Sequence, residues 1–159
     1  MKIFIGTDHA GYILKEKLVS SLKMQGYEVV DKGAFEYNES DDYPDFIALV
    51  AEEVSKDPVN SCGIILGGNG QGEAIVANRF QSVRAVVYYG KAESGENMEM
   101  NIIEKTRQHD NANILSLGAR YLTEESMISA VELWLNTPFS GDKRHIRRLK
   151  KIDDLKISK

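Results

Sequence analysis

The sequence predicts an α/β fold in which helices cover both faces of a five-stranded parallel sheet, giving a three-layer sandwich. Three observations predict this fold. Short apolar runs alternate with segments of helical periodicity along the 159 residues. Several of these runs end in glycine or in a cluster of polar residues. We find no internal repeat and no linker composition, so residues 1–159 are expected to form one domain.

The expected elements follow the chain in regular alternation. Strands are predicted at residues 3–5, 28–31, 63–66, 83–89 and 113–117. Helical periodicity begins at Tyr12 and ends near Gly26, resumes after Pro44 and stops at Pro58, and recurs over residues 74–78, about 101–108 and 124–135. A basic helix is expected from residue 142 to about 155. Residues 90–100 are polar and acidic, which predicts a surface excursion.

Composition excludes several classes of protein. The formal net charge of −4 disfavours binding to nucleic acid or to an anionic membrane surface, and no apolar run approaches the length of a transmembrane helix. The lone cysteine, Cys62, excludes an internal disulfide and a cysteine-based zinc site, which suits a reducing cytoplasm. The three histidines are not grouped with carboxylates at ligand spacing, so no metal site is predicted.

The most informative stretch is a glycine-rich loop after the third predicted strand, Gly67-Gly68-Asn69-Gly70-Gln71-Gly72-Glu73. Glycines this dense let the backbone approach a ligand closely, and N–H groups at a helix start can seat an oxyanion or a phosphate. Glu73 at the end of the loop is a candidate general base. The alternatives are an ordinary glycine-rich turn and a glutamate that only favours the helix dipole.

The loop differs from the common nucleotide-binding loops. It lacks the Gly-Lys-Ser/Thr ending of a P-loop, and the turn at residues 7–11 lacks the G-x-G-x-x-G fingerprint. These absences favour a cofactor-free reaction on a small anion over hydride or phosphoryl transfer. A nucleotide-binding α/β domain is the less favoured alternative.

Other polar clusters follow strands or lie on connections that return to them: Asp8-His9, His109-Asp110 and Arg120. Ligands of such folds bind beyond the carboxyl ends of the strands, so these clusters are expected to share one site with the glycine loop. His109 is a candidate acid because its pKa is near working pH, or else a helix-capping residue.

Arg144 and Arg148 are four residues apart on the basic helix, which suits bidentate capture of a phosphate or, alternatively, a solvated face. Cys62 precedes the third predicted strand and is interpreted as a small buried residue, not a nucleophile.

Taken together, the motifs point to a known family. They are Gly6-Thr7-Asp8-His9-Ala10-Gly11, Asp31-Lys32-Gly33, Asp41-Asp42-Tyr43-Pro44, the glycine loop, Ala77-Asn78-Arg79, Arg107-Gln108-His109-Asp110-Asn111-Ala112-Asn113, Gly118-Ala119-Arg120 and Arg144-His145-Ile146-Arg147-Arg148. In this order they resemble the ribose-5-phosphate isomerase B family, which also contains allose-6-phosphate and galactose-6-phosphate isomerases. The resemblance spans nearly the whole chain.

The resemblance implies a cofactor-free aldose–ketose isomerase that converts ribose 5-phosphate to ribulose 5-phosphate through a cis-enediolate. It implies a five-stranded Rossmann-like sheet and a homodimer or tetramer, with each active site between two subunits. The histidine and some arginines would then come from the partner chain. An isomerase of a six-carbon sugar phosphate and a non-catalytic sugar-phosphate-binding protein remain as alternatives.

The resemblance also assigns roles to individual residues. Glu73 corresponds to the base of one branch, and Gly67 to the position of a cysteine base in the other branch. His109 corresponds to the residue that helps to open the sugar ring. Substrate or phosphate contacts are implied for Asp8, His9, Gly68, Asn69, Gly70, Gln71, Gly72, Asp110, Arg120, Arg144 and Arg148.

Two features depart from the family pattern. Asp110 stands where asparagine is usual, and an ionised aspartate cannot donate a hydrogen bond to the enediolate and would repel it. The segment at residues 90–100 is longer than is typical, and it could act as a lid, shape a dimer contact or have no role.

Overall fold

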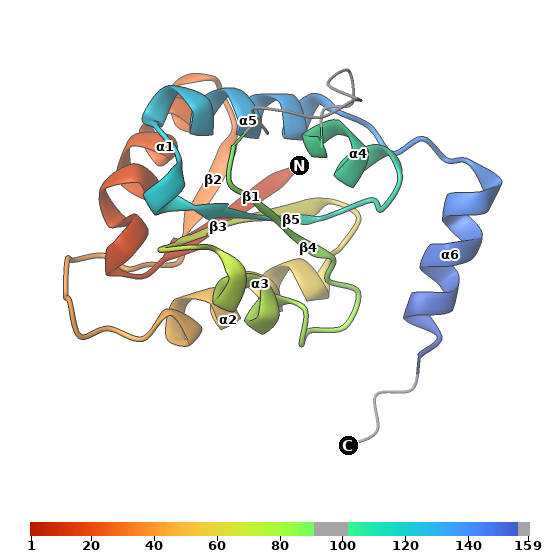
Figure 1. Ribbon diagram of the computed structural model, residues 1–159, viewed down its shortest axis with the longest axis horizontal. Helices are drawn as coiled ribbons and strands as arrows, with labels where there is room; N and C mark the ends of the chain where they lie inside the picture. Colours follow the sequence, from red (N-terminus) through yellow and green to blue (C-terminus); the bar gives the residue numbers. More distant parts are fainter. Residues whose placement is uncertain (91–101, 156–159) are drawn as a thin grey trace.

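One parallel sheet organises the structure, a computed structural model that describes residues 1–90 and 102–155 (Figure 1). Within these residues the strand order is β2-β1-β3-β5-β4. The strands are β1 (Lys2–Thr7), β2 (Glu28–Asp31), β3 (Ser61–Gly67), β4 (Ala85–Tyr88) and β5 (Ile114–Gly118). All four pairings are parallel. The predicted five-stranded parallel sheet is therefore confirmed.

Helices form the two outer layers of the sandwich (Figure 1). One face of the sheet is covered by α1 (Tyr12–Met24), α4 (Ile102–Gln108) and α5 (Glu124–Asn136). The other face is covered by α2 (Tyr43–Lys56) and α3 (Gln71–Ala77). Two 3₁₀ turns, η1 (His9–Gly11) and η2 (Ala119–Tyr121), follow β1 and β5. The predicted three-layer arrangement is confirmed as well.

The helix α6 (Lys143–Asp153) extends away from the sandwich (Figure 1). It is the basic helix that the sequence predicts, and His145 is its one buried residue. No helix among the described residues is long and apolar enough to cross a membrane.

The core lies in two clusters, one on each face of the sheet. Ile64 and Leu66 pack in the cluster under α1, α4 and α5, whereas Ile65 between them packs in the cluster under α2 and α3. Successive side chains of a strand point to opposite faces, so a strand covered on both sides needs apolar residues at every position. This requirement explains why the strands are continuous apolar runs in the sequence.

The boundary of the third strand differs from the prediction. β3 begins at Ser61, and its second residue, Cys62, pairs with Ile3 of β1 instead of preceding the strand. Small polar residues at the start of a strand do not extend an apolar run, so the sequence pattern missed them. Cys62 is buried, and burial raises the pKa of its thiol to about 12, which agrees with a structural role.

Residues 91–101, which include most of the predicted surface excursion, lie outside the described residues.

A buried lysine of α1 binds the end of β2 and the segment that follows it. This segment in turn pairs with the end of β1, next to the candidate site. Lys15 is fully buried, and its Nζ donates to Asp31 Oδ2 (2.6 Å) and to the carbonyl of Ala34 (2.8 Å). The segment between these two acceptors pairs with Thr7: the Thr7 N–H donates to the Gly33 carbonyl (2.8 Å), and the Ala34 N–H donates to the Thr7 carbonyl (2.7 Å). Lys15 therefore stabilises the segment that is hydrogen-bonded to Thr7, the last residue of β1.

We expect Lys15→Ala to lower the free energy of unfolding by about 3 kcal/mol, because it leaves a half-buried carboxylate and a buried carbonyl without their donor. Urea denaturation measures this loss. Lys23→Ala on the exposed face of the same helix is the matched control, and it should change the stability by less than about 0.5 kcal/mol. Equal losses in the two variants would contradict the role of Lys15.

Candidate active site

A cavity of about 290 Å³ opens beyond the carboxyl ends of β1, β3 and β5. Its lining residues come from the turns that follow these three strands, from the first turn of α3 and, with one residue, from α2. They are Asp8, His9, Ala10, Tyr43, Gly68, Asn69, Gly72, Glu73 and Arg120. The chain leaves β1 toward one edge of the sheet and β3 toward the other edge, so the cavity lies at the switch point where α/β sheets bind ligands.

Glu73 is buried in the wall of this cavity. It lies in the first turn of α3, is 4% exposed, and its Oε2 has no hydrogen-bond partner among the described residues. Burial raises the pKa of this carboxyl above its ordinary value, and the charge of Asp8 adds to the shift. A carboxylate with a raised pKa and an unpaired oxygen is a proton acceptor suited to general-base chemistry.

The carboxylate of Glu73 occupies the space beside Gly67. A Cβ atom at position 67 would lie 1.7 Å from Glu73 Oε1 and 2.1 Å from its Cδ. No side chain fits at position 67 while Glu73 keeps this conformation, so the last residue of β3 has to be glycine.

Three hydrogen bonds fix the conformation of the turn after β3, and two of them involve residues outside the turn. Gly70 has a left-handed backbone (φ 75°), and its carbonyl accepts a hydrogen bond from Ser116 Oγ of β5 (2.6 Å). The Gln71 N–H donates to Asn69 Oδ1 (2.9 Å), and the Gln71 side chain donates to the Tyr89 hydroxyl. Gly70 and Gln71 therefore shape the loop, and they do not line the cavity as Gly68, Asn69 and Gly72 do.

On the opposite wall, His9 is held by a carboxylate from the connection between β2 and α2. Its Nδ1 lies 2.6 Å from Asp41 Oδ1, which also accepts from the His9 backbone N–H (3.1 Å). This hydrogen bond raises the pKa of His9. Beside it, Asp8 Oδ1 accepts from the Ala10 N–H (3.0 Å), and burial raises the pKa of Asp8.

Asp8, His9 and Asp41 also offer ligand atoms within 4.8 Å of one another, which is close enough to hold a metal ion. This grouping differs from the expectation that no histidine lies near carboxylates at ligand spacing. Asp41 is 32 residues from His9 in the sequence, so the contact depends on the fold and not on a local motif.

His109 and Asp110 do not reach this cavity within one chain. They follow α4 and precede β5, and the next residue, Asn111, lines a different cavity together with Ser61 at the start of β3. They therefore lie at the amino-terminal edge of the sheet. Within one chain, this pair therefore does not join the other polar clusters at the carboxyl edge.

His109 is packed against α6 instead. Its ring lies 4.3 Å from the ring of the buried His145, centroid to centroid. Burial and the neighbouring His145 lower the pKa of His109, so its imidazole is largely neutral at pH 7. Arg144 and Arg148 are exposed on the same helix and also lie outside the cavity.

The sequence patterns missed three residues. In the sequence, Asp41 and Tyr43 only precede a predicted helix, whereas in the structure Asp41 binds His9 and Tyr43 packs against Gly72, where a Cβ atom would lie 2.8 Å from Tyr43 Cζ. His145 was interpreted only as part of a basic helix. No local spacing indicates these contacts, because each joins segments that are far apart along the chain.

Comparison with known proteins identifies the family. The family model described as Ribose/Galactose Isomerase matches residues 3–152. The chain belongs to the ribose/galactose isomerase family.

Relatives across this family are similar along nearly their whole length. Ribose-5-phosphate isomerase B of Mycobacterium tuberculosis is 36% identical over 149 residues, which cover 94% of this chain and 86% of that protein. The crystal structure of ribose-5-phosphate isomerase B from Mycoplasma genitalium with bound ribulose-5-phosphate is 37% identical, with a TM-score of 0.86 over 96% of this chain and 93% of that one. The Clostridium thermocellum enzyme is 40% identical, with a TM-score of 0.84 over 97% and 96%.

The resemblance inferred from the motifs is thereby confirmed. The similarity extends from β1 through most of α6, so both the cavity residues and those of α6 lie within the region shared by the ribose/galactose isomerase family. The chain is an isomerase with a Rossmann-like α/β fold.

The His9–Asp41 contact has a measurable pH signature. Because the pKa of His9 is raised above its ordinary value of about 6.5, the stabilisation from this contact is fully present below that value and is lost as the pH rises through the folded-state pKa. We expect Asp41→Asn to lower the His9 pKa, as followed by NMR titration of the imidazole. The free energy of unfolding of this variant should also fall more at about pH 6 than at about pH 9.

Asp42→Asn is the matched control, because Asp42 makes no side-chain cap to α2 and lies next in the sequence. A His9 pKa that is the same in the two variants would show that Asp41 does not hold the imidazolium.

Proposed function

We propose that the protein is a ribose-5-phosphate isomerase that interconverts ribose 5-phosphate and ribulose 5-phosphate through a cis-enediolate. The observation that supports it most directly is the buried carboxylate of Glu73, whose Oε2 has no partner among the described residues, in a cavity lined by the glycine loop and by charged groups that suit a phosphorylated sugar. The relatives with the same fold are ribose-5-phosphate isomerases B, and one of them has ribulose-5-phosphate bound.

Glu73 is the base in this reaction. Its carboxylate removes the proton from C2 of the open-chain aldose, and the electrons of that C–H bond form the enediolate double bond. The π electrons of the C1 carbonyl move onto O1 as that double bond forms. The protonated carboxyl then returns the proton to C1 while the proton of the C2 hydroxyl passes to O1, so that C2 becomes the carbonyl carbon of the ketose. A raised pKa favours both steps, since the group is a stronger base when ionised and remains able to donate once protonated. No electron leaves the substrate, so the step needs no redox cofactor.

The amides of the glycine loop face the negative charge that develops on the oxygens at C1 and C2. Gly68, Asn69 and Gly72 line the cavity near Glu73. Fixed N–H groups stabilise an oxyanion without reorganising during the reaction. His9, with its raised pKa, adds positive charge on the opposite wall, and Arg120 adds positive charge beside Gly68, so these two groups bind the rest of the phosphorylated sugar.

We further propose that a second copy of the chain completes the site. His109, to which the resemblance assigns ring opening, is not among the residues that line the cavity of its own chain; it lies at the far edge of the sheet beside an exposed basic helix. Arg144 and Arg148 on α6 face solvent, and α6 extends away from the sandwich (Figure 1). In a symmetric dimer these three residues of one subunit reach the cavity of the other.

The neutral imidazole of His109 then accepts the proton of the anomeric hydroxyl and, once protonated, donates to the ring oxygen. The two arginines bind the phosphate. Asp110 would lie near the enediolate in that arrangement, so its carboxylate has to point away or be replaced there by Asn111.

The choice of sugar is tested by comparing substrates. We propose ribose 5-phosphate, and a coupled assay against ribose 5-phosphate, allose 6-phosphate and galactose 6-phosphate should give the highest kcat/KM for the first. A higher value for a six-carbon substrate would reassign the substrate while leaving the reaction class unchanged.

We expect Glu73→Gln to lower kcat by about a thousandfold, because the amide cannot accept the C2 proton. Exchange of that proton with solvent deuterium, followed by NMR, should stop, while calorimetry should still detect substrate binding. In the unmodified protein, kcat should fall as the pH drops through the raised pKa of Glu73.

The exposed Glu125→Gln serves as the control and should retain full activity. Full activity of Glu73→Gln would remove Glu73 as the base. Binding without any C2 exchange in the unmodified protein would favour a sugar-phosphate-binding protein instead.

The shared site is tested by mixing subunits. Glu73→Gln and His109→Asn are each expected to be inactive alone. After subunit exchange, a mixed dimer has one site with both changes and one site with neither. Activity should therefore recover to about a quarter of that of the unmodified protein. No recovery after exchange, with mixed dimers verified by native mass spectrometry, would contradict a site shared between subunits.

A further inference from the structure

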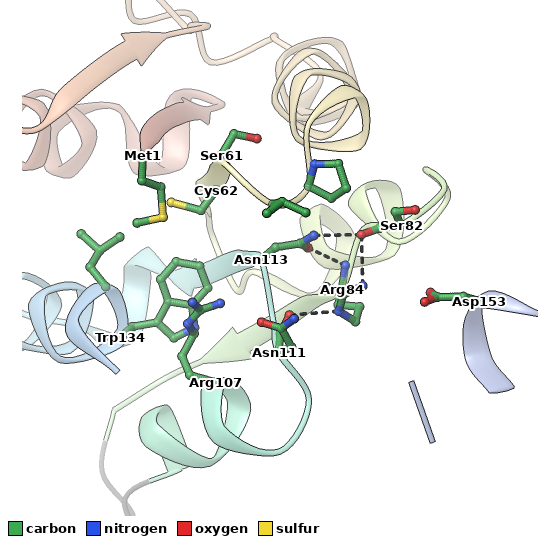
Figure 2. Close-up of a pocket in the computed structure, with 13 residues that line it drawn as sticks. Met1, Ser61, Cys62, Ser82, Arg84, Arg107, Asn111, Asn113, Trp134 and Asp153 are labelled. Atoms are coloured by element: carbon green, nitrogen blue, oxygen red, sulfur yellow. Dashed lines mark hydrogen bonds between the residues drawn. The ribbon is translucent and has the colours of Figure 1, made fainter. Parts of the chain in front are cut away.

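A second cavity lies at the amino-terminal edge of the sheet, opposite the candidate active site (Figure 2). Its volume is about 400 Å³, and it shares no lining residue with the first cavity. Its polar wall contains Arg84, Arg107, Asn111, Asn113 and Asp153, and Trp134 lies beside Arg107. Neither the reaction proposed above nor the core packing uses the open space between these residues.

The two arginines are anchored by backbone carbonyls and not by carboxylates. Arg84 Nε donates to the Asn111 carbonyl (2.9 Å), and its Nη1 donates to the Ser82 carbonyl (3.4 Å). Arg107 Nε donates to the Thr137 carbonyl (3.2 Å), and its Nη1 donates to the Ala112 carbonyl. Neither guanidinium forms a salt bridge within residues 1–90 and 102–155.

The positive charge in this cavity is therefore poorly compensated. Burial lowers the pKa of both Arg84 and Arg107, and the charge of Arg84 lowers that of Arg107 further. Asp153 of α6 attracts Arg84 across the cavity but is not within salt-bridge distance. Two cations face one carboxylate, so a net positive charge remains in a partly buried space.

The unused hydrogen-bonding groups of this wall include several donors, which face the carboxylate of Asp153. Each guanidinium has five N–H groups, and the contacts above engage two on each side chain. The indole Nε1 of Trp134, which lines the same cavity, is buried and has no partner among the described residues. Donors that are desolvated and unpaired favour a ligand with several acceptor oxygens.

We propose that this cavity binds the phosphate group of a small molecule between Arg84 and Arg107. A phosphate fits better than a carboxylate, because its oxygens point in tetrahedral directions and can accept from two separate guanidiniums at once. The site is separate from the proposed reaction and does not depend on it. Because the same guanidiniums hold the carbonyls of Asn111 and Ala112, the bound phosphate contacts the groups that fix the segment after His109.

The chain contains its own reporter for this site. Trp134 is the single tryptophan of the sequence, and the Arg107 guanidinium lies 4.9 Å from its ring centroid. Titration with inorganic phosphate at constant ionic strength, maintained with sodium chloride, should change the tryptophan fluorescence in a saturable manner. Acetate should bind at least about tenfold more weakly than phosphate, since it can satisfy only one guanidinium.

Substitutions separate this site from the candidate active site. Arg84→Gln should weaken phosphate binding by about tenfold, the effect of losing one charge-assisted hydrogen bond. Asp153→Asn should strengthen it by about threefold, because the opposing carboxylate is removed. Asp154→Asn is the matched control on the same helix and should leave the affinity unchanged. Arg120→Gln, which alters the other cavity, should also leave the fluorescence titration unchanged.

Three results would overturn the proposal: the absence of a saturable signal with phosphate, equal binding of acetate and phosphate, and loss of the signal in Arg120→Gln. If Arg84→Gln does not fold, the comparison of Asp153→Asn with Asp154→Asn decides, and equal affinities in these two variants would reject the site.

Discussion

The hydrogen bond that joins the ends of β1 and β3 determines where the candidate site forms. The Thr7 hydroxyl donates to the Leu66 carbonyl (2.9 Å), and the turn after β1 lies directly on the end of β3. A Cβ atom at Gly11 would lie 2.3 Å from Thr7 Oγ1 and 2.7 Å from Leu66 Cβ, so this close approach requires glycine. It places Asp8 beside the glycine loop, so this contact joins the two walls of the cavity.

The sequence predicts where each strand lies and which residues form its apolar interior, but it does not predict the order of the strands in the sheet. The run Ile64-Ile65-Leu66 predicts a strand covered on both faces, because each face needs its own apolar residue. Glu73 follows such a strand directly, so its place at the carboxyl edge could also be predicted. His109 precedes a strand, and the packing of the connection around it is determined by contacts with α6 that no local pattern contains. The partner of His9 is likewise a distant residue.

The two edges of the sheet differ in the buried atoms that have no partner among the described residues. At the carboxyl edge these atoms are acceptors, Asp41 Oδ2 and Glu73 Oε2, whereas at the amino edge the atom is a donor, Trp134 Nε1, next to two guanidiniums. The segment between α4 and β5 connects these regions in the assembly that we propose. Its carbonyls are bound by Arg84 and Arg107 at one edge of its own subunit, while its histidine serves the cavity of the other subunit.

Gly67 and the carboxylate of Glu73 share one space at the end of β3. The resemblance implies a second branch of the family with a cysteine at the position of Gly67. In this structure the Glu73 carboxylate fills the volume where that side chain would begin, so a Cβ atom at position 67 requires the Glu73 side chain to move. A cysteine at position 67 and a glutamate at position 73 would therefore compete for the same place beside the candidate active site.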